Sequence, residues 1–452
     1  MSSIVLSKTA VLLSSIFVLL AYFVGQPASH TLTALGFWRQ PSRSLLADDQ
    51  TDLIVIADTV NCEDLHYHAA SQSLFTACED TVETRFSWFP PLAIFDDPSV
   101  LETTRGSLHV IDPETATSRR LAMHGFTGPF CTHGIDILDD PDRPDGEAVY
   151  IYAINHLPNP DFPWNGTPAE KDAASAAVPK ARSRIEVFHH VIGSSTATHL
   201  RSVQHPLIRT PNDIFAASPR SFYVTNDHYY CDGLLRAVET VVAAARWSDI
   251  VRVDMDESAD AAVDPTQGIT VSAALERLHN PNGLGHGRTP DEVLVSDCSS
   301  GVLNVFRLSP PPSKLPLELE SSVRADSVID NPSYFADPYS SAGSAGLPPD
   351  DRSGYVLPGI SHGFNLTHTS HDPAASEGVI VMFAHHASLS LDNSEAIEAP
   401  RLLFQDDGSR IRSASAAVLL AIDPKLEGGR RRAWLFVTGF QSVSAIAVKV
   451  DL

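Results

Sequence analysis

Short apolar runs typical of β-strands recur from residue 53 to the end of the chain. They are rich in Val, Ile, Phe and Tyr, and Gly, Pro, Asp and Asn separate them. The runs are Leu53–Ala57, Leu74–Cys78, Ser107–Ile111, Ala148–Ile154, Arg184–Phe188, Phe222–Thr225, Val293–Ser296, Val302–Leu308, Val379–Phe383, Ala417–Ile422, Trp434–Thr438 and Ala445–Val450. The strand-to-helix alternation of an α/β protein is missing, so the pattern predicts an all-β fold. Residues 293–308 resemble the inner two strands of a propeller blade.

One segment departs from this pattern. Residues 234–247 (LLRAVETVVAAARW) have helical composition and a broad apolar face. They predict either a helix packed on the scaffold or a lid or membrane-facing helix beside a site. The low-complexity stretches 309–316 and 335–354 are expected to be surface insertions between strands. Nothing else indicates a boundary, so residues 45–452 are expected to form a single domain.

The N-terminus carries a separate apolar segment. Lys8 precedes a run from Ala10 to Val24, which has the length of a signal peptide, and no good cleavage site follows. Residues 1–30 are therefore expected to be a signal peptide or a retained membrane anchor. Either one predicts a secretory-pathway protein, secreted or membrane-anchored, whose main domain faces the lumen or the outside. The glycosylation sequons at Asn165 and Asn365 agree with this.

Charge and cysteine content narrow the classes further. The formal net charge is −23, which disfavours nucleic acid and anionic membrane surfaces as partners. Some of the carboxylates could instead bind hard cations such as calcium. The five cysteines form no CxxC pair, so a zinc ribbon or a thioredoxin-like site is disfavoured. In an oxidising compartment, a Cys62–Cys78 disulfide could join the two strands of one hairpin.

Acidic and amide residues stand at predicted strand ends across the chain. They are Glu63, Asp64, Asn212, Asp213, Asn282, Asp330 and Asn331. Each alone is more typical of a turn, but calcium takes six to eight oxygens from such residues. Two histidines, His133 and His156, flank one β-type unit and could form a proton-transfer pair.

Six motifs, in order along the chain, resemble those of the serum paraoxonase/arylesterase family. They are HGIDIL, VYIYAINHLP, RIEVFHH, PNDIFAASPRSFYVTNDHYY, NPNGLG and VIDNPSY. The resemblance is clear from residue 63 to residue 331 and looser from there to the C-terminus. The resemblance implies a six-bladed β-propeller with two calcium ions in a central tunnel. Vertebrate members close the ring with a disulfide between the N-terminal strand and the last strand. Here the last cysteine is Cys298, so that disulfide is absent.

The resemblance also implies the site residues. The catalytic calcium would be bound by Glu63, Asn212, Asn282, Asp330 and Asn331. The structural calcium would be bound by Asp64, Asp213 and the backbone carbonyl of Ile135. The histidine dyad maps to His133 and His156, and the Asp227-His228 pair would have a supporting role.

These residues together predict a calcium-dependent hydrolase of lactones, aryl esters or both, acting on small molecules. Calcium would polarise the substrate carbonyl while the dyad activates water. The N-terminal segment holds none of the implied ligands. We therefore expect it to be dispensable for catalysis, although it could associate the protein with a membrane.

Other readings stay open at this point. The related sugar-lactonase and strictosidine-synthase-like propellers are alternatives, as is a non-catalytic calcium-bound propeller. Residues 359–363 fit the G-x-S-x-G esterase motif, but the sequence after the serine is not helix-like. No H-E-x-x-H zinc motif occurs.

Overall fold

A computed structural model describes residues 26–39, 52–175, 177–258, 264–309, 316–340, 350–386 and 399–452. The apolar run at residues 10–24, on which the signal-peptide or anchor prediction depends, lies outside these residues. Within the described ranges, no helix is long and apolar enough to cross a membrane.

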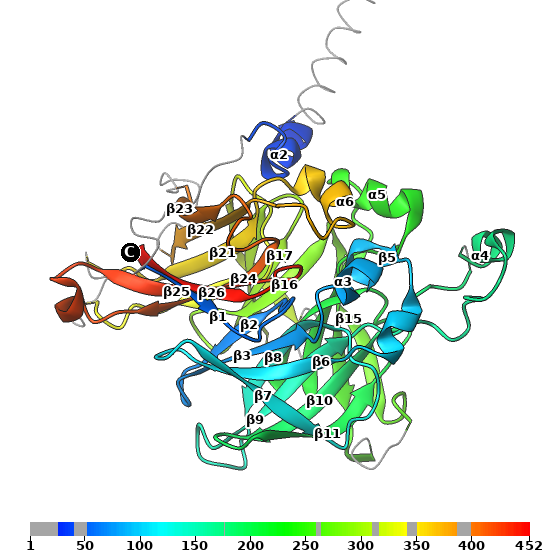
Figure 1. Cartoon of the computed structure of the whole chain (residues 1–452), viewed down its shortest axis with the longest axis horizontal. Helices are drawn as coiled ribbons and strands as arrows, with labels where there is room; N and C mark the ends of the chain where they lie inside the picture. Colours follow the sequence, from blue (N-terminus) through cyan, green and yellow to red (C-terminus); the bar gives the residue numbers. More distant parts are fainter. Residues whose placement is uncertain are drawn as a thin grey trace, which may run out of the picture.

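Six groups of four antiparallel strands make up most of the described chain (Figure 1). The first contains β1 (Leu53–Ile56), β26 (Ala445–Asp451), β25 (Arg432–Gly439) and β24 (Ala414–Ala421). The second contains β2 (Leu65–His68), β3 (Ser73–Glu79), β6 (Gly106–Asp112) and β7 (Thr117–His124). The third contains β8 (Thr132–Asp139), β9 (Ala148–Asn155), β10 (Arg184–Val191) and β11 (Thr196–Val203), and β11 also pairs in parallel with β7.

The other three groups are separate sheets. They are β12 (Pro211–Ser218), β13 (Ser221–Asn226), β14 (Ser248–Met255) and β15 (Ile269–Leu278); β16 (Pro281–His286), β17 (Glu292–Asp297), β18 (Val302–Leu308) and β19 (Leu317–Arg324); and β20 (Ser333–Phe335), β21 (Gly354–Ile360), β22 (Val379–His385) and β23 (Arg401–Asp406). A further two-stranded sheet joins β4 (Trp88–Phe89) and β5 (Ile94–Phe95).

The six groups form a closed ring. Their first strands, β2, β8, β12, β16, β20 and β24, each contact the next one, and β24 contacts β2. A separate apolar core lies between each neighbouring pair of groups. Burying apolar surface on both faces of every sheet is what holds such a ring together. Strands β1 and β26 close it without a covalent bond, with Leu53 opposite Val448 (Figure 1).

The predicted all-β fold is confirmed, and each of the twelve predicted runs overlaps a strand, with only Ala57 and Ile422 lying one residue beyond the strand end. One prediction is wrong in detail: residues 293–308 form β17 and β18, which are the middle strands of their sheet rather than the inner two. The middle strands are buried on both faces, so their sequences are continuous apolar runs that are easy to recognise.

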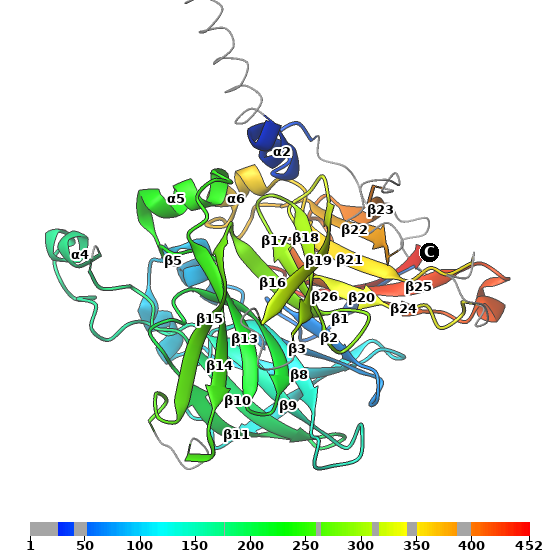
Figure 2. The same cartoon turned by 180° about the vertical axis from the view of Figure 1, so that it is seen from behind.

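Short helices gather at one end of the ring. These are α2 (Gln26–Ala34), α5 (Gly233–Val241) and α6 (Leu366–Thr369), which lie at the same end in both views (Figures 1 and 2). Of the predicted helical segment 234–247, only the first part is helical, in α5. Within the ranges that the structure describes, the remaining helical elements are α3 (Thr84–Ser87), α4 (Pro168–Ser175) and the 3-10 turns η2 (Pro90–Leu92), η3 (Pro98–Glu102), η5 (Gly363–Asn365) and η7 (Pro424–Glu427).

The predicted Cys62–Cys78 disulfide is confirmed. It links the residues just before β2 to β3, its neighbour in the sheet, and so fixes the start of an innermost strand. Disulfides persist in oxidising compartments, so this bond agrees with an extracytoplasmic location. Cys131, Cys231 and Cys298 are free thiols.

Candidate metal and catalytic site

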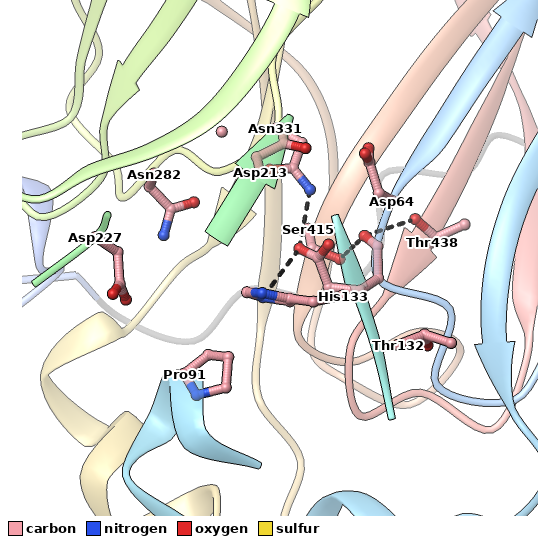
Figure 3. Close-up of polar contacts among 12 residues, drawn as sticks. Asp64, Pro91, Thr132, His133, Asp213, Asp227, Asn282, Asn331, Ser415 and Thr438 are labelled. Atoms are coloured by element: carbon pink, nitrogen blue, oxygen red, sulfur yellow. Dashed lines mark hydrogen bonds and ion pairs between the residues drawn. The ribbon is translucent and has the colours of Figure 1, made fainter. Parts of the chain in front are cut away.

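Most of the predicted site residues lie at or just before the beginnings of innermost strands. Glu63 and Asp64 precede β2, Asn212 and Asp213 are the second and third residues of β12, Asn282 is the second residue of β16, and Asp330 and Asn331 precede β20. Ile135 lies within β8, and His156 directly follows β9. His133 is the second residue of β8. Because consecutive inner strands contact one another around the ring, these side chains converge from separate parts of the sequence. Figure 3 shows the side chains of His133, Asn282 and Asn331 directed toward one region.

Five buried oxygens in this region share one property. Each is a side-chain oxygen with no hydrogen-bond partner: Glu63 Oε2, Asn212 Oδ1, Asn282 Oδ1, Asp330 Oδ1 and Asn331 Oδ1. Leaving a buried polar atom unsatisfied costs about 1–3 kcal/mol, more when it is charged. A hard cation bound by all five would remove that cost, and carboxylate and amide oxygens are the ligands calcium prefers. The five predicted ligands of the catalytic calcium therefore fit such an ion.

The electrostatics agree with a cation site. Burial raises the pKa of Glu63 well above its usual value, and the nearby charges of Asp330 and Asp64 raise it further. Burial also raises the pKa of Asp330, again with a contribution from Asp64. Like charges held this closely destabilise one another unless a positive charge lies between them. Among the described residues, no three His, Cys, Asp or Glu side chains could hold a metal alone. A cation bound in this region would therefore need amide oxygens among its ligands.

Hydrogen bonds fix Glu63 in place. Its Oε1 accepts from Asn331 Nδ2 at 2.9 Å, which leaves Oε2 as the unpaired oxygen. Its backbone carbonyl accepts hydrogen bonds from the hydroxyls of Ser415 and Thr438 (Figure 3). Strands β24 and β25 therefore position a residue that comes more than 350 places earlier in the sequence.

The two predicted catalytic histidines are in contact and almost fully buried. His156 Nε2 lies 3.1 Å from His133 Nδ1, and His156 Nδ1 lies 2.8 Å from the hydroxyl oxygen of Ser183. His133 Nε2 is 3.8 Å from Glu63 Oε1. Burial lowers the pKa of both histidines, that of His156 to about 3, so both are neutral at neutral pH.

A cavity of about 180 Å³ gives access to this region. His133, Asn212, Asn282 and Asp330 line it on one side. The rest of its lining combines apolar residues, such as Phe89, Val328 and Phe440, with polar ones that include Asp227, His228 and Arg236. A larger cavity of about 630 Å³ lies around β6, β7 and β10, but none of the predicted site residues lines it. The smaller cavity is therefore the one that the predicted site residues line.

Comparisons with known proteins find sequence similarity to one family of esterases. Residues 170–278 match the Arylesterase family. Serum paraoxonase/arylesterase 2 of Canis lupus familiaris is 24% identical over 230 residues, 50% of this chain and 53% of that protein. Serum paraoxonase/arylesterase 1 of Homo sapiens is 30% identical over 159 residues, 35% of this chain and 37% of that protein. Over these regions the chain is similar to the serum paraoxonase/arylesterase family.

The matched regions cover about half the length of these curated paraoxonases. Among solved structures, a luciferin-regenerating enzyme aligns with 87% of this chain and 92% of its own, at 9% identity and a TM-score of 0.39. A likeness that low supports no inference. The family resemblance that the motifs predicted is confirmed.

Two of the residues implied as ligands of the structural calcium, Asp64 and Asp213, directly follow Glu63 and Asn212 in the sequence. Asp64 accepts hydrogen bonds from the backbone N–H groups of Leu65 and Ile135, and Asp213 from those of Ile214 and Leu284. The Asp64 carboxylate thus connects the start of β2 to β8, and the Asp213 carboxylate connects β12 to β16. Burial and the charges of Asp64 and Glu63 raise the pKa of Asp213 well above its usual value. Asp64 and Asp213 are therefore a second pair of like charges. Asp64 already has a cationic neighbour in His66, whose Nε2 lies 2.9 Å from Asp64 Oδ2 and whose pKa is raised to about 9.

Some residues around the site were not predicted from the sequence. Arg85 is fully buried, and its guanidinium carbon lies 4.1 Å from the ring centre of Phe89. The same ring makes edge contacts with His133 and His156, at 5.2 and 6.2 Å between ring centres. No feature of the sequence indicates that an arginine in a short helix is buried against an aromatic ring beside the histidine pair.

The G-x-S-x-G motif does not form an esterase elbow. Ser361 is followed by the 3-10 turn η5 and by α6, a helix of only four residues. The Ser361 hydroxyl lies 3.0 Å from His362 Nδ1, but His362 Nε2 is hydrogen-bonded to the carbonyl of Arg39 rather than to a carboxylate. A nucleophile elbow needs a strand-to-helix turn, so this alternative is disfavoured.

Glycines allow the inner strands to approach the ligands, and this gives a testable expectation. A Cβ on Gly283 would lie 2.5 Å from Asn331 Cα and 2.6 Å from Asn331 Oδ1. Gly283→Ala should therefore displace Asn331 and weaken calcium binding at least about ten-fold. A misplacement of about 1 Å in an active site can lower the rate about 100-fold, so a displaced ligand oxygen should have a large effect. Gly128→Ala, whose Cβ would approach only the Phe126 ring tip at 3.7 Å, is the matched control. Equal calcium affinity in the two variants would contradict the assignment of Asn331.

Proposed function

We propose that this paraoxonase-like chain is a calcium-dependent hydrolase of lactones and aryl esters, built on a six-bladed β-propeller. Five unpaired oxygens support the proposal: Asn212, Asn282 and Asp330 line the cavity together with His133, and Asn331 is hydrogen-bonded to Glu63, which lies beside His133. The closed ring of six four-stranded groups supports the propeller. Its innermost strands would line the tunnel in which the ligands meet.

The proposed chemistry divides between the ion and the protein. When bound, calcium would supply a Lewis acid that polarises the carbonyl oxygen of the substrate. Glu63, Asn212, Asn282, Asp330 and Asn331 would hold it. A second ion at Asp64, Asp213 and the Ile135 carbonyl would serve stability, and the repulsion at Asp213 supports it.

The histidine pair would remove a proton from the attacking water. For His133 to accept it at Nε2, His133 Nδ1 must carry a proton and donate to His156 Nε2 across the 3.1 Å contact. His156 Nδ1 then donates to the Ser183 hydroxyl. The relay holds both rings in one tautomer, and the neutral state of His133 leaves Nε2 free to act as a base.

The setting of the enzyme is also proposed. The Cys62–Cys78 disulfide supports a place in the secretory pathway. The apolar N-terminal run predicts a secreted or membrane-anchored protein with the site facing the lumen or the outside. The apolar residues in the cavity lining suit small lipophilic esters and lactones as substrates.

A substrate panel tests this function. Purified protein should hydrolyse phenyl acetate and γ- or δ-lactones in calcium-containing buffer. Excess EGTA should stop the hydrolysis, and added calcium should restore it, whereas magnesium should not because it demands a smaller octahedral site. A protein that binds calcium but hydrolyses none of these substrates would instead be the non-catalytic calcium-bound propeller.

A further inference from the structure

Residues 30–39, the end of α2 and the segment after it, are packed against the rim of the catalytic cavity. Backbone and side-chain hydrogen bonds hold them: His30 Nε2 with the Ser300 carbonyl at 2.7 Å, Val328 N–H to the Ala34 carbonyl at 2.9 Å, Phe364 N–H to the Leu35 carbonyl at 3.1 Å, and Arg39 Nη1 to the Ser361 carbonyl at 2.6 Å. Several partners lie in or beside the cavity lining. The segment therefore belongs structurally to the folded unit.

The side chain of Leu35 forms part of the cavity wall. Leu35 is only 6% exposed and packs with Val328 and Ile360 in one small apolar cluster. All three residues line the same cavity as His133 and Asn282. A larger or smaller side chain at Leu35 would thus change the space available to a substrate.

The next residue explains how the wall is held in position. Gly36 has φ +71°, a left-handed conformation that favours glycine. A Cβ there would overlap the carbonyl oxygen of Ser361. The segment can therefore approach the Ser361 backbone only because residue 36 has no side chain.

We propose that Leu35 is a specificity-determining residue of the catalytic cavity, limiting the size of the acyl group, and that docking through Gly36 builds this wall. The substrate in this inference rests on the proposed ester hydrolysis, whereas the docking of residues 30–39 does not. It also revises the sequence-based expectation for the N-terminus: a chain that begins at residue 40 should keep its metal ligands and lose its selectivity.

Acyl-chain selectivity tests the role of Leu35. The measured quantity is the ratio of kcat/KM for p-nitrophenyl decanoate to that for p-nitrophenyl acetate, which have the same leaving group. Leu35→Ala should raise this ratio about ten-fold, and Leu35→Phe should lower it about ten-fold, because a single methylene in an apolar pocket changes selectivity by about that factor. Trp38→Ala, which truncates a 67% exposed side chain of the same segment, should leave the ratio unchanged.

Opposite shifts in the two Leu35 variants support the proposal, since mere destabilisation would move both ratios the same way. Ratios within two-fold of the parent in both variants would overturn it.

Amide hydrogen exchange tests the docking independently of activity. In Gly36→Ala the amides of Val328 and Phe364 should exchange at least about ten-fold faster than in the parent; unchanged exchange would overturn the docking. A parent protein with no esterase activity would refute the proposed function and the role of Leu35 in selectivity. The hydrogen-exchange result would still decide whether residues 30–39 dock through Gly36.

Discussion

Removing calcium with excess EGTA should lower the melting temperature of the protein by at least about 5 °C. At calcium concentrations about a thousand times Kd, binding stabilises the folded state by about 4 kcal/mol. Dividing this free energy by the unfolding entropy of a chain of this length gives a shift in melting temperature of roughly 5 °C. Repulsion among Glu63, Asp330 and Asp64 should add to the loss once the ion is gone. Differential scanning calorimetry with and without EGTA measures the shift.

A variant control shows whether the shift comes from the proposed ligands. Asp330→Asn removes one of the negative charges that raise the pKa of Glu63. It should therefore show a smaller EGTA-dependent shift than the parent. Glu102→Gln, at an exposed position in η3, should behave like the parent. A parent protein that melts at the same temperature in EGTA and in calcium would refute the cation site.

The second large effect separates the metal site from the histidine pair. Asn282→Ala removes one of the five unpaired oxygens. We expect kcat/KM at limiting calcium to fall at least about 100-fold for lactones and aryl esters alike, because both depend on the same stabilised oxyanion. Excess calcium should restore part of the activity if the loss lies in ion binding.

His133→Gln should act differently. It removes the proposed base and its 3.1 Å contact with His156 but leaves the five oxygens in place. Lactone hydrolysis should fall about 100-fold or more, and esters with good leaving groups should be less affected. Calcium affinity and the melting temperature in calcium should stay close to the parent's. Full lactonase activity in this variant would show that the dyad is structural.

The sequence predicts the middle strands well and most of the innermost and outer strands poorly. Strand β17 is buried along almost its whole length and reads as a plain apolar run, so it was recognised. Strand β16, with the sequence PNGLGH, is equally buried but was missed because glycine and asparagine are typical of turns. Outer strands such as β15 were missed because exposed residues interrupt them. The innermost strand β24 was predicted, because its sequence ASAAVLLA is an almost continuous apolar run.

The site was identifiable only through the family resemblance. Nothing local marks Asn282 or Asn331 as ligands, since each is separately typical of a turn. Their convergence depends on the closure of the ring, which brings Glu63 next to Ser415 and Thr438. The contribution of Leu35 could not be predicted, because an apolar residue at the end of a short helix gives no indication of what it packs against.

Calcium binding and ester hydrolysis, measured together on one preparation, test the central claim most directly. Protein stripped with EGTA and dialysed would be titrated with calcium by isothermal titration calorimetry, and phenyl acetate hydrolysis would be followed over the same free-calcium range. The proposed site predicts that activity rises with occupancy of a calcium site and that this binding event is lost in Asn282→Ala. Full hydrolysis before any calcium is bound would contradict the account.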